Sequence, residues 1–417
     1  MARRMSKAKK RLIGGIATAV LVVGIAVPFS CIPRPPDGTR TPERVTVREA
    51  FRQVAARPVR VLLVSKQPTA TVGTTASYSI LSADGSQTLA RGEGESLPES
   101  IVRATSRGLD IGGAALPHAA LRIRPVRDGA AMVNGRRYRG ELLVRRESDG
   151  TVSIINLLPL DSYLYSVLGS ETYASWPDAA HDAQAIVART YTLWRMIDRN
   201  DKHFDVHASV QDQSYQGVAK ETPRLRAAVD RTAGVVLLYQ AKLFRAYYHS
   251  TCGGHTEAVE DYFPDAPLLP LSGVRCDYCQ ASKHYRWRRD IVKADVAKAL
   301  RADGVPLHQV AAVEVLSRTK SGRADLVAVE DGEGRRHRVA AARFRLAIGA
   351  GTLPSTWFEV YDRGASIEFR GRGWGHGVGM CQWGARGMAE AGYGAEDILR
   401  HYYTGATLER LYNRPAP

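Results

Sequence analysis

An uninterrupted apolar segment near the N-terminus constrains this chain more than any other feature. Residues 12–29 carry no charge, and six Lys or Arg side chains precede them within residues 1–11. A basic flank followed by such a run is typical of a signal peptide or a signal anchor. Pro28-Phe29-Ser30 is a poor cleavage site, which favours an uncleaved anchor. We therefore predict that residues 1–30 form a cytoplasmic basic flank and a transmembrane segment, with the body of the chain exported.

The charge balance indicates an anionic partner. The 417 residues include 58 Lys and Arg against 42 Asp and Glu, a formal net charge of +16. A body this basic is attracted to polyanions such as nucleic acid, an anionic cell wall or a membrane surface. Export argues against nucleic acid. The membrane, through the N-terminal helix, and the wall are the partners that we expect.

Composition along the chain divides the exported part into three. Residues 31–56 are Pro-rich and predict a stalk and linker. Residues 57–156 alternate short β-rich runs with Gly, Asp and Ser turns. Residues 157–412 contain helical patterns, over residues 161–171 and from Ser175 onward, mixed with strands. The absence of regular βαβ alternation predicts an α+β fold, with strands and helices around a central substrate cleft.

Glu171 is the first candidate for chemistry. It follows Leu164, Val167 and Leu168 on the apolar face of its helix. A carboxyl on that face loses solvation, its pKa rises, and it can then donate a proton near neutral pH. The alternative is a buried glutamate neutralised by Arg189 on the next helix.

A glycine-rich stretch over residues 371–385 is the second candidate. Its glycines allow close approach of a ligand, and it fits neither of the common phosphate-binding motifs. Trp374, His376, Gln382 and Trp383 offer the aromatic faces and hydrogen-bonding groups that suit sugar rings. The alternative is a tightly packed turn with a core tryptophan.

A group of cysteines and histidines predicts a metal site. A Cys-x-x-Cys pair and a second ligand group some twenty residues away have the spacing of a structural zinc site. Five side chains compete for four positions: His249, Cys252, His255, Cys276 and Cys279. A disulfide is the alternative in an exported chain, but three cysteines cannot all pair. Cys381 beside His376 could also suggest a thiol nucleophile, although a lone cysteine is more often a packed residue.

Three segments together resemble the stage II sporulation protein D family of lytic transglycosylases, which includes amidase enhancers. The resemblance covers roughly residues 59–412. It is carried by residues 158–191, by His249-Ser-Thr-Cys-Gly-Gly-His-Thr256, and by residues 373–385. It implies that Glu171 is the catalytic acid and base, and that Arg189 and Tyr215 bind substrate. Some relatives bind zinc through Cys and His. Asp182, Cys381 and Trp383 depart from the usual Lys, Ser and Tyr.

The resemblance implies cleavage of peptidoglycan between N-acetylmuramic acid and N-acetylglucosamine, leaving 1,6-anhydro ends. Ordinary glycosidases pair two carboxyls, whereas a transglycosylase can use one because the substrate supplies its own nucleophile. Two other functions stay open: a non-catalytic wall-binding partner that enhances an amidase, and a zinc hydrolase.

Overall fold

The computed structural model describes residue 54 and residues 56–126, 128–199 and 203–412. All the described residues belong to one compact unit. Among them, no helix combines the length and the apolar character needed to cross a bilayer. The predicted anchor over residues 1–30 and most of the predicted stalk lie outside the described residues.

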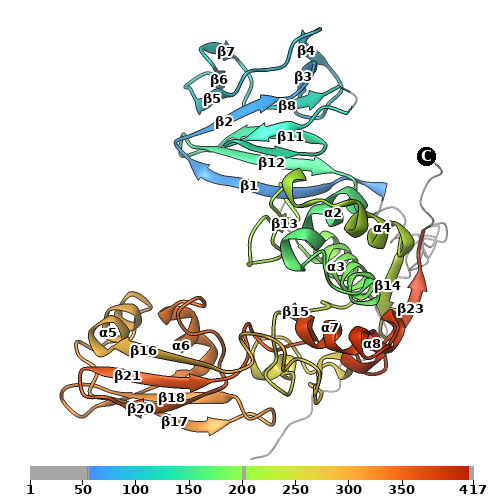
Figure 1. Cartoon of the computed structure of the whole chain (residues 1–417). Coiled ribbons are helices and arrows are strands. Elements are labelled where there is room, and N and C mark those ends of the chain that lie inside the picture. Colours follow the sequence, from blue (N-terminus) through green and yellow to red (C-terminus); the bar gives the residue numbers. More distant parts are fainter. Residues whose placement is uncertain (1–53, 55, 127, 200–202, 413–417) are drawn as a thin grey trace, which may run out of the picture. The chain divides into compact units, whose positions relative to one another are not determined.

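The β-rich part forms two sheets (Figure 1). The seven-stranded sheet has the order β13-β1-β12-β11-β8-β3-β4, and the six-stranded sheet has the order β10-β9-β2-β5-β6-β7. The strands are β1 (Val59–Gln67), β2 (Thr69–Thr74), β3 (Tyr78–Ser82), β4 (Thr88–Gly92), β5 (Ser100–Ala104), β6 (Leu109–Ile111), β7 (Ala114–Leu116), β8 (Ala120–Pro125), β9 (Ala131–Val133), β10 (Arg136–Tyr138), β11 (Glu141–Arg146), β12 (Val152–Leu158) and β13 (Val206–His207). Alternate residues such as Leu121, Ile123, Leu142 and Val144 are fully buried, because successive side chains in a strand point to opposite faces.

Two helices follow β12 in the chain, and the first of them carries Glu171. α2 (Leu160–Glu171) packs Leu164, Val167 and Leu168 into the same hydrophobic cluster as the strands. α3 (Asp178–Asp198) is buried on opposite sides: Ala185 and Ala188 belong to that cluster, and other α3 residues belong to a second one. α3 begins at Asp178, after Pro177, three residues later than the helix predicted from Ser175.

The second cluster collects segments from far apart in the sequence. They are β14 (Val235–Leu238), β15 (Tyr248–His249), β22 (Met380–Cys381), α7 (Gln382–Glu390), α8 (Ala395–Tyr402) and β23 (Thr407–Arg410), with 3-10 turns at Val259–Asp261 and Leu269–Leu271. α4 (Pro223–Arg231) packs Leu225, Ala228 and Val229 into the first cluster, and a further 3-10 turn spans Val218–Lys220. β14 pairs with β23, and β15 runs parallel to β22. The glycine-rich stretch therefore supplies a short strand and the start of α7.

Residues 287–369 have a hydrophobic cluster of their own. Their elements are β16 (Trp287–Val292), α5 (Lys293–Ala302), β17 (Ala312–Arg318), β18 (Ala324–Glu330), β19 (Arg336–Ala340), α6 (Ala341–Ile348), β20 (Phe358–Asp362) and β21 (Ser366–Gly371). The strands form two three-stranded sheets, β16-β21-β20 and β17-β18-β19. α5 begins only at Lys293, because the preceding residues pair with β21 as a strand. The predicted α+β class is confirmed.

Candidate functional site

A cavity of about 490 Å³ lies where α2, α3, the β15 segment and the glycine-rich stretch meet. Glu171, the last residue of α2, lines it. The other lining residues are Tyr191, Val210, Gln211, Asp212, Arg245, Tyr247, Tyr248, His249, Ser250, Tyr262, Phe263, Arg345, Leu346, Ala350, Gly351, Trp374, Gly375, His376 and Gln382. Aromatic rings and a few polar groups make a cavity of the kind that binds small molecules or sugar units.

Glu171 is held by hydrogen bonds and by no cation. The backbone N–H of Ser214 donates to its Oε1 at 2.7 Å, and the Gln382 amide lies 3.4 Å from Oε2. None of the ion pairs among the described residues involves Glu171. Burial raises its pKa, and the hydrogen bonds from Ser214 and Gln382 offset only part of that rise. Such a carboxyl holds a proton at a higher pH than an exposed glutamate.

A glycine brings the Ser214 segment close to α2. A Cβ on Gly169 would lie 1.9 Å from the carbonyl oxygen of Lys220, so no larger residue fits there. Ser166, on the same helix, donates to the carbonyl of Gly217 at 3.0 Å. These contacts fix residues 214–220 against α2 and so place the Ser214 N–H on Glu171.

Asp212 is the other carboxyl of the cavity wall, and it forms ion pairs and a hydrogen bond with neighbouring side chains. Its oxygens lie 2.8 Å from Arg195 and 3.2 Å from Arg199, and Tyr191 donates to it at 2.8 Å. Two arginines and a hydroxyl thus already occupy the Asp212 carboxyl oxygens. Glu171 is therefore the acidic group of the cavity wall suited to exchange a proton.

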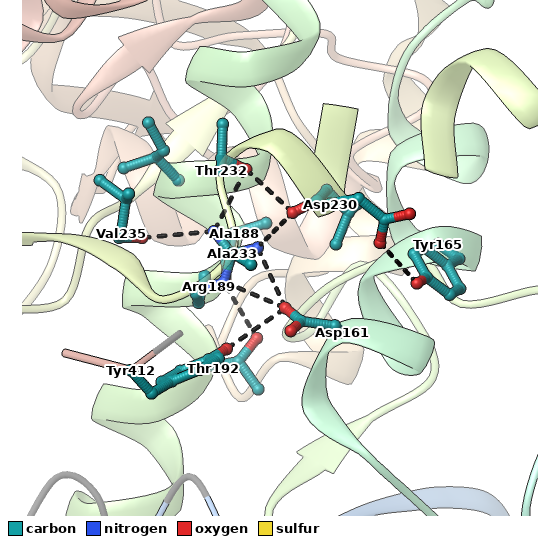
Figure 2. A network of polar contacts seen from close by, with 12 residues as sticks. Asp161, Tyr165, Ala188, Arg189, Thr192, Asp230, Thr232, Ala233, Val235 and Tyr412 are labelled. Carbon is teal, nitrogen blue, oxygen red and sulfur yellow. Dashed lines mark hydrogen bonds and ion pairs between the residues drawn. The ribbon is translucent and has the colours of Figure 1, made fainter. Parts of the chain in front are cut away.

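Arg189 does not reach the cavity. It is fully buried and binds Asp161 at 3.0 Å, the carbonyls of Val229 and Val235, and the hydroxyl of Thr232 (Figure 2). Neither expectation for Arg189 matches this geometry: it neither neutralises Glu171 nor is exposed to a substrate. Its guanidinium ties α3 to α2 and to the start of β14.

Tyr215 is also placed away from the cavity. Only 2% of it is exposed, its hydroxyl donates to Asn156 at 2.7 Å, and its ring packs between Tyr138 and Tyr163. The prediction that Tyr215 binds substrate is therefore corrected. Its position in the chain matters instead, because its burial and its hydrogen bond to Asn156 anchor the backbone next to Ser214.

Trp374, His376 and Gln382 lie on the cavity wall with Glu171, as a binding role requires. The Trp374 ring is 4.3 Å from that of His284. Burial holds the pKa of His376 well below its ordinary value, so His376 is neutral at pH 7 and can act as a hydrogen-bonding group. Their substrate contacts remain predictions.

The two histidines of the predicted metal set do not join the cysteines. His249 lines the cavity, its Nδ1 lies 3.1 Å from the carbonyl oxygen of Val378, and burial lowers its pKa to about 3. His255 has its Nδ1 beside the carbonyl of Thr256 at 2.6 Å.

Four cysteines form a cluster instead. The sulfurs of Cys252, Cys276, Cys279 and Cys381 lie within 4.8 Å of one another, and all four residues are buried. The predicted set thus keeps its three cysteines, loses His249 and His255, and gains Cys381. Because its Sγ lies in this cluster, Cys381 is poorly placed to act as a nucleophile.

The cluster has the dimensions of a tetrathiolate metal site. Zinc binds sulfur at about 2.3 Å, which corresponds to about 3.8 Å between ligands at the corners of a tetrahedron. Cys252 and Cys279 sulfurs are 3.5 Å apart. Arg323, fully buried, donates to the carbonyls of Cys252 and His255 at 2.7 and 2.9 Å. Its positive charge offsets the excess negative charge that four thiolates place around a divalent ion.

Two cavity residues were not singled out in the sequence. Arg245 stacks on Tyr247 at 4.5 Å and on Trp194 at 5.2 Å, and its buried Nε makes no hydrogen bond among the described residues. The Tyr248 hydroxyl is buried beside the Glu171 carboxyl and makes no hydrogen bond of good geometry in the described part of the chain. The sequence showed only a strand pattern here. An unpaired donor aimed at a cavity is a group that a ligand can satisfy.

Two residues that differ from those usual in the family, Asp182 and Trp383, make contacts with neighbouring side chains. Asp182 pairs with Arg231 of α4 at 2.7 Å, so its negative charge is compensated there. Trp383 packs against Trp176 with ring centroids 5.5 Å apart.

Comparison with known proteins agrees with these features. The profile of the family described as "Stage II sporulation protein" matches residues 148–239, which include α2 and α3, and a domain of unknown function matches residues 271–379. An uncharacterised protein of Brachyspira hyodysenteriae is 32% identical over 283 residues, 68% of this chain and 74% of that protein. Stage II sporulation protein D of Bacillus subtilis is 30% identical over 266 residues, 60% of this chain and 74% of that protein. The amidase enhancer of Bacillus subtilis is 27% identical over 288 residues, 59% of this chain and 40% of that protein.

The fold and the site thus define an α+β protein with one buried carboxyl of raised pKa on an aromatic cavity. The chain belongs to the stage II sporulation protein D family.

Proposed function

We propose that this protein is a cell-wall enzyme, a lytic transglycosylase that cuts the bond between N-acetylmuramic acid and N-acetylglucosamine in peptidoglycan. The observation that carries the proposal is the state of Glu171: a buried carboxyl on a cavity, with a raised pKa and without an ion pair to any described residue. The second carboxyl, Asp212, is held by two arginines. The cavity therefore supports a one-carboxyl reaction better than a paired-carboxyl hydrolysis.

The reaction needs one proton to leave Glu171 and one to return. Protonated Glu171 donates to the glycosidic oxygen as the bond from the muramyl C1 to that oxygen breaks. The resulting carboxylate takes the proton of the muramyl 6-hydroxyl, and the 6-oxygen bonds to C1 to close a 1,6-anhydro ring. Glu171 is protonated again and ready for another cut.

Three sets of groups assist this exchange. The N–H of Ser214 and the amide of Gln382 orient the Glu171 carboxyl and stabilise it while it is ionised. Trp374 offers an aromatic face to a sugar ring. Tyr248 and Arg245 present unpaired donors to hydroxyl or carboxylate oxygens of the substrate.

We propose that the four-cysteine cluster holds a structural Zn²⁺. Four protein thiolates leave no coordination position for water, so the ion would supply stability and take no part in the cut. Cys252 follows His249 by three residues and Cys381 precedes Gln382, so the ion would join two segments that line the cavity. A zinc hydrolase, the rival that needs a metal-bound water, is not favoured by this ligand set.

The place of action that fits this chemistry is the outer side of the cell membrane. The proposal rests on the basic and apolar pattern of residues 1–30 and on the family's amidase enhancer, which also suggests wall enzymes as partners. A non-catalytic partner that stimulates an amidase is the alternative, and it would use the same cavity for binding alone.

The decisive experiment compares wild type with Glu171→Gln and Glu257→Gln. Glu257 is a second buried carboxyl with a raised pKa, but it does not line the cavity. Purified glycan, with and without stem peptides, is digested and analysed by mass spectrometry. We expect anhydro-muramyl ends from wild type and Glu257→Gln, and none from Glu171→Gln. Normal anhydro products from Glu171→Gln would refute the role of Glu171, and no products from any of the three would favour the non-catalytic partner.

A further inference from the structure

A second cavity, of about 530 Å³, lies at the end of the β16-β21-β20 sheet and is strongly basic. Its nine lining residues include four arginines and one acidic residue: Arg286, Trp287, Arg288, Trp357, Phe358, Glu359, Arg370, Gly371 and Arg372. The acidic residue, Glu359, is paired with Arg318 at 2.8 Å. The cavity therefore presents excess positive charge.

Strand alternation explains how the charges gather on one face. Arg288 lies opposite Arg370 in the β16–β21 register, and Glu359 lies opposite Arg370 in the β20–β21 register. The next residues on this face, two positions along each chain segment, are Arg286, Arg372 and Trp357. The N–H of Arg372 donates to the carbonyl of Trp357 at 2.9 Å, which continues the pairing. Trp287 and Phe358, which alternate with them, pack into the core.

Like charges directly opposite one another destabilise a sheet unless something compensates them. Glu368, fully buried, does so for one pair: it binds Arg288 at 2.9 Å and also contacts Arg370 and Arg363. Arg286 and Arg372 have no acidic partner among the described residues. A fold that retains uncompensated arginines side by side is consistent with a binding role, because local rules are most often broken at functional sites.

Trp357 adds an aromatic surface to the arginines. Its ring lies 5.3 Å from the guanidinium carbon of Arg372 and 5.3 Å from that of buried Arg323. A Cβ on Gly322 would lie 3.4 Å from the same ring, so the ring is firmly packed on that side. An aromatic ring beside guanidinium groups suits a sugar ring that carries an acidic substituent.

The two cavities are adjacent along the backbone. Arg372 lines the basic cavity, and Trp374 lines the Glu171 cavity. Two residues of extended chain span at most about 7 Å, so the two walls lie close together. The Trp287 indole donates to the carbonyl of Gly373 at 2.8 Å and holds the connecting residue in place.

We propose that the basic cavity is a distal subsite for the same glycan strand that enters the Glu171 cavity. The inference rests on the proposed function. The subsite recognises the carboxylate of a muramyl unit several sugars from the cut, with Arg286 and Arg372 as its ligands and Trp357 under the sugar ring. That carboxylate belongs either to the lactyl group or to an attached stem peptide. The continuity of the two walls favours a glycan strand over a phosphate-rich wall polymer.

The test measures binding of the full chain in a Glu171→Gln background, so that no strand is cut. The double variant Arg286→Gln/Arg372→Gln is compared with Arg336→Gln/Arg338→Gln, two exposed arginines of β19 that do not line the cavity. The probes are long glycan strands with and without stem peptides, a muramyl-containing tetrasaccharide, and purified teichoic acid.

We expect the Arg286/Arg372 pair to weaken binding of long strands about tenfold, equivalent to about 1.4 kcal/mol, and to reduce its salt dependence. The control pair should change it less than twofold, and tetrasaccharide binding should change little. Loss on denuded strands identifies the lactyl carboxylate, and loss confined to peptide-bearing strands identifies the stem peptide.

Three results would overturn the subsite. They are an equal loss of affinity in both double variants, no loss of affinity for long strands in Arg286→Gln/Arg372→Gln, and a loss of affinity for teichoic acid alone. Trp357→Phe gives a second readout: a smaller ring should weaken long strands and leave teichoic acid unchanged. If wild type cuts no glycan but the strand-length effect is present, the distal subsite survives and lytic activity fails. If wild type cuts glycan and the Arg286/Arg372 pair binds like wild type, the subsite alone fails.

Discussion

Replacing Arg189 with methionine distinguishes a structural role from substrate binding. Methionine fills a comparable volume but has no charge and no donors. The substitution leaves Asp161 without its cation and leaves the carbonyls of Val229 and Val235 without the guanidinium donors. We therefore expect a large loss of stability.

The size of that loss follows from burial. Breaking a buried ion pair by removing one partner costs about 3–5 kcal/mol, and each buried acceptor left unsatisfied costs about 1–3 kcal/mol. These costs overlap. The Asp161 side chain is 22% exposed, so water can solvate part of its charge. An expected loss of about 3–4 kcal/mol follows. Arg189→Lys should recover part of it, because an ammonium keeps the charge but cannot reach all the acceptors.

Urea unfolding gives the stability, and glycan binding by the folded fraction gives the function. We expect Arg189→Met to shift the unfolding midpoint strongly, while its folded fraction binds glycan with nearly wild-type affinity. A variant as stable as wild type that binds glycan ten times more weakly would show that Arg189 contacts substrate and that our placement of it is wrong.

Two other expectations concern Glu171 and the cysteine cluster. Because burial raises the Glu171 pKa above its ordinary value of 4.5, the cleavage rate should fall as pH rises through that raised pKa; a rate that increases there would contradict the acid role. The free energy of unfolding should change in the same direction, because folding favours the neutral form of Glu171. It should fall as pH rises over this window, by about 1.4 kcal/mol for each unit by which folding raises the Glu171 pKa. Glu171→Gln should remove that fall. Protein purified without chelator should contain about one zinc per chain by metal analysis. Cys381→Ser should lower the zinc content. If Cys381→Ser keeps its zinc and His255→Ala loses it, the ligand set of cysteines and histidines predicted from the sequence would be correct instead.

The secondary structure of the site was largely predictable because its signals are local. Apolar spacing placed Glu171 on the inner face of a helix, and α2 ends at that residue. Trp374, His376 and Gln382 stood out through the unusual glycine-rich stretch, and all three line the same cavity as Glu171.

The wrong predictions concern residues whose surroundings are set by burial or by contacts with segments distant in the sequence. Arg189 and Tyr215 were assigned to substrate by resemblance, but the segments that bury them, including β14 and residue Asn156, are remote in sequence. Cys381 is more than a hundred residues from Cys252, and only the parallel pairing of β15 with β22 brings their sulfurs together. The strand β16 was missed because Arg289 lies on the same face as Trp287 and Ile291 and interrupts the apolar alternation.

The burial of α3 on opposite sides has a mechanical consequence. One face contributes Ala185 and Ala188 to the core beneath the large sheets, and the other contributes Ile186 and Val187 to the core around the cysteines. Neither core can lose this helix without opening the other. The two cores on either side of α3 should therefore melt as one cooperative block. Residues 287–369 have a core of their own, so local unfolding there would remove only the part of the cavity wall that Arg345, Leu346, Ala350 and Gly351 supply.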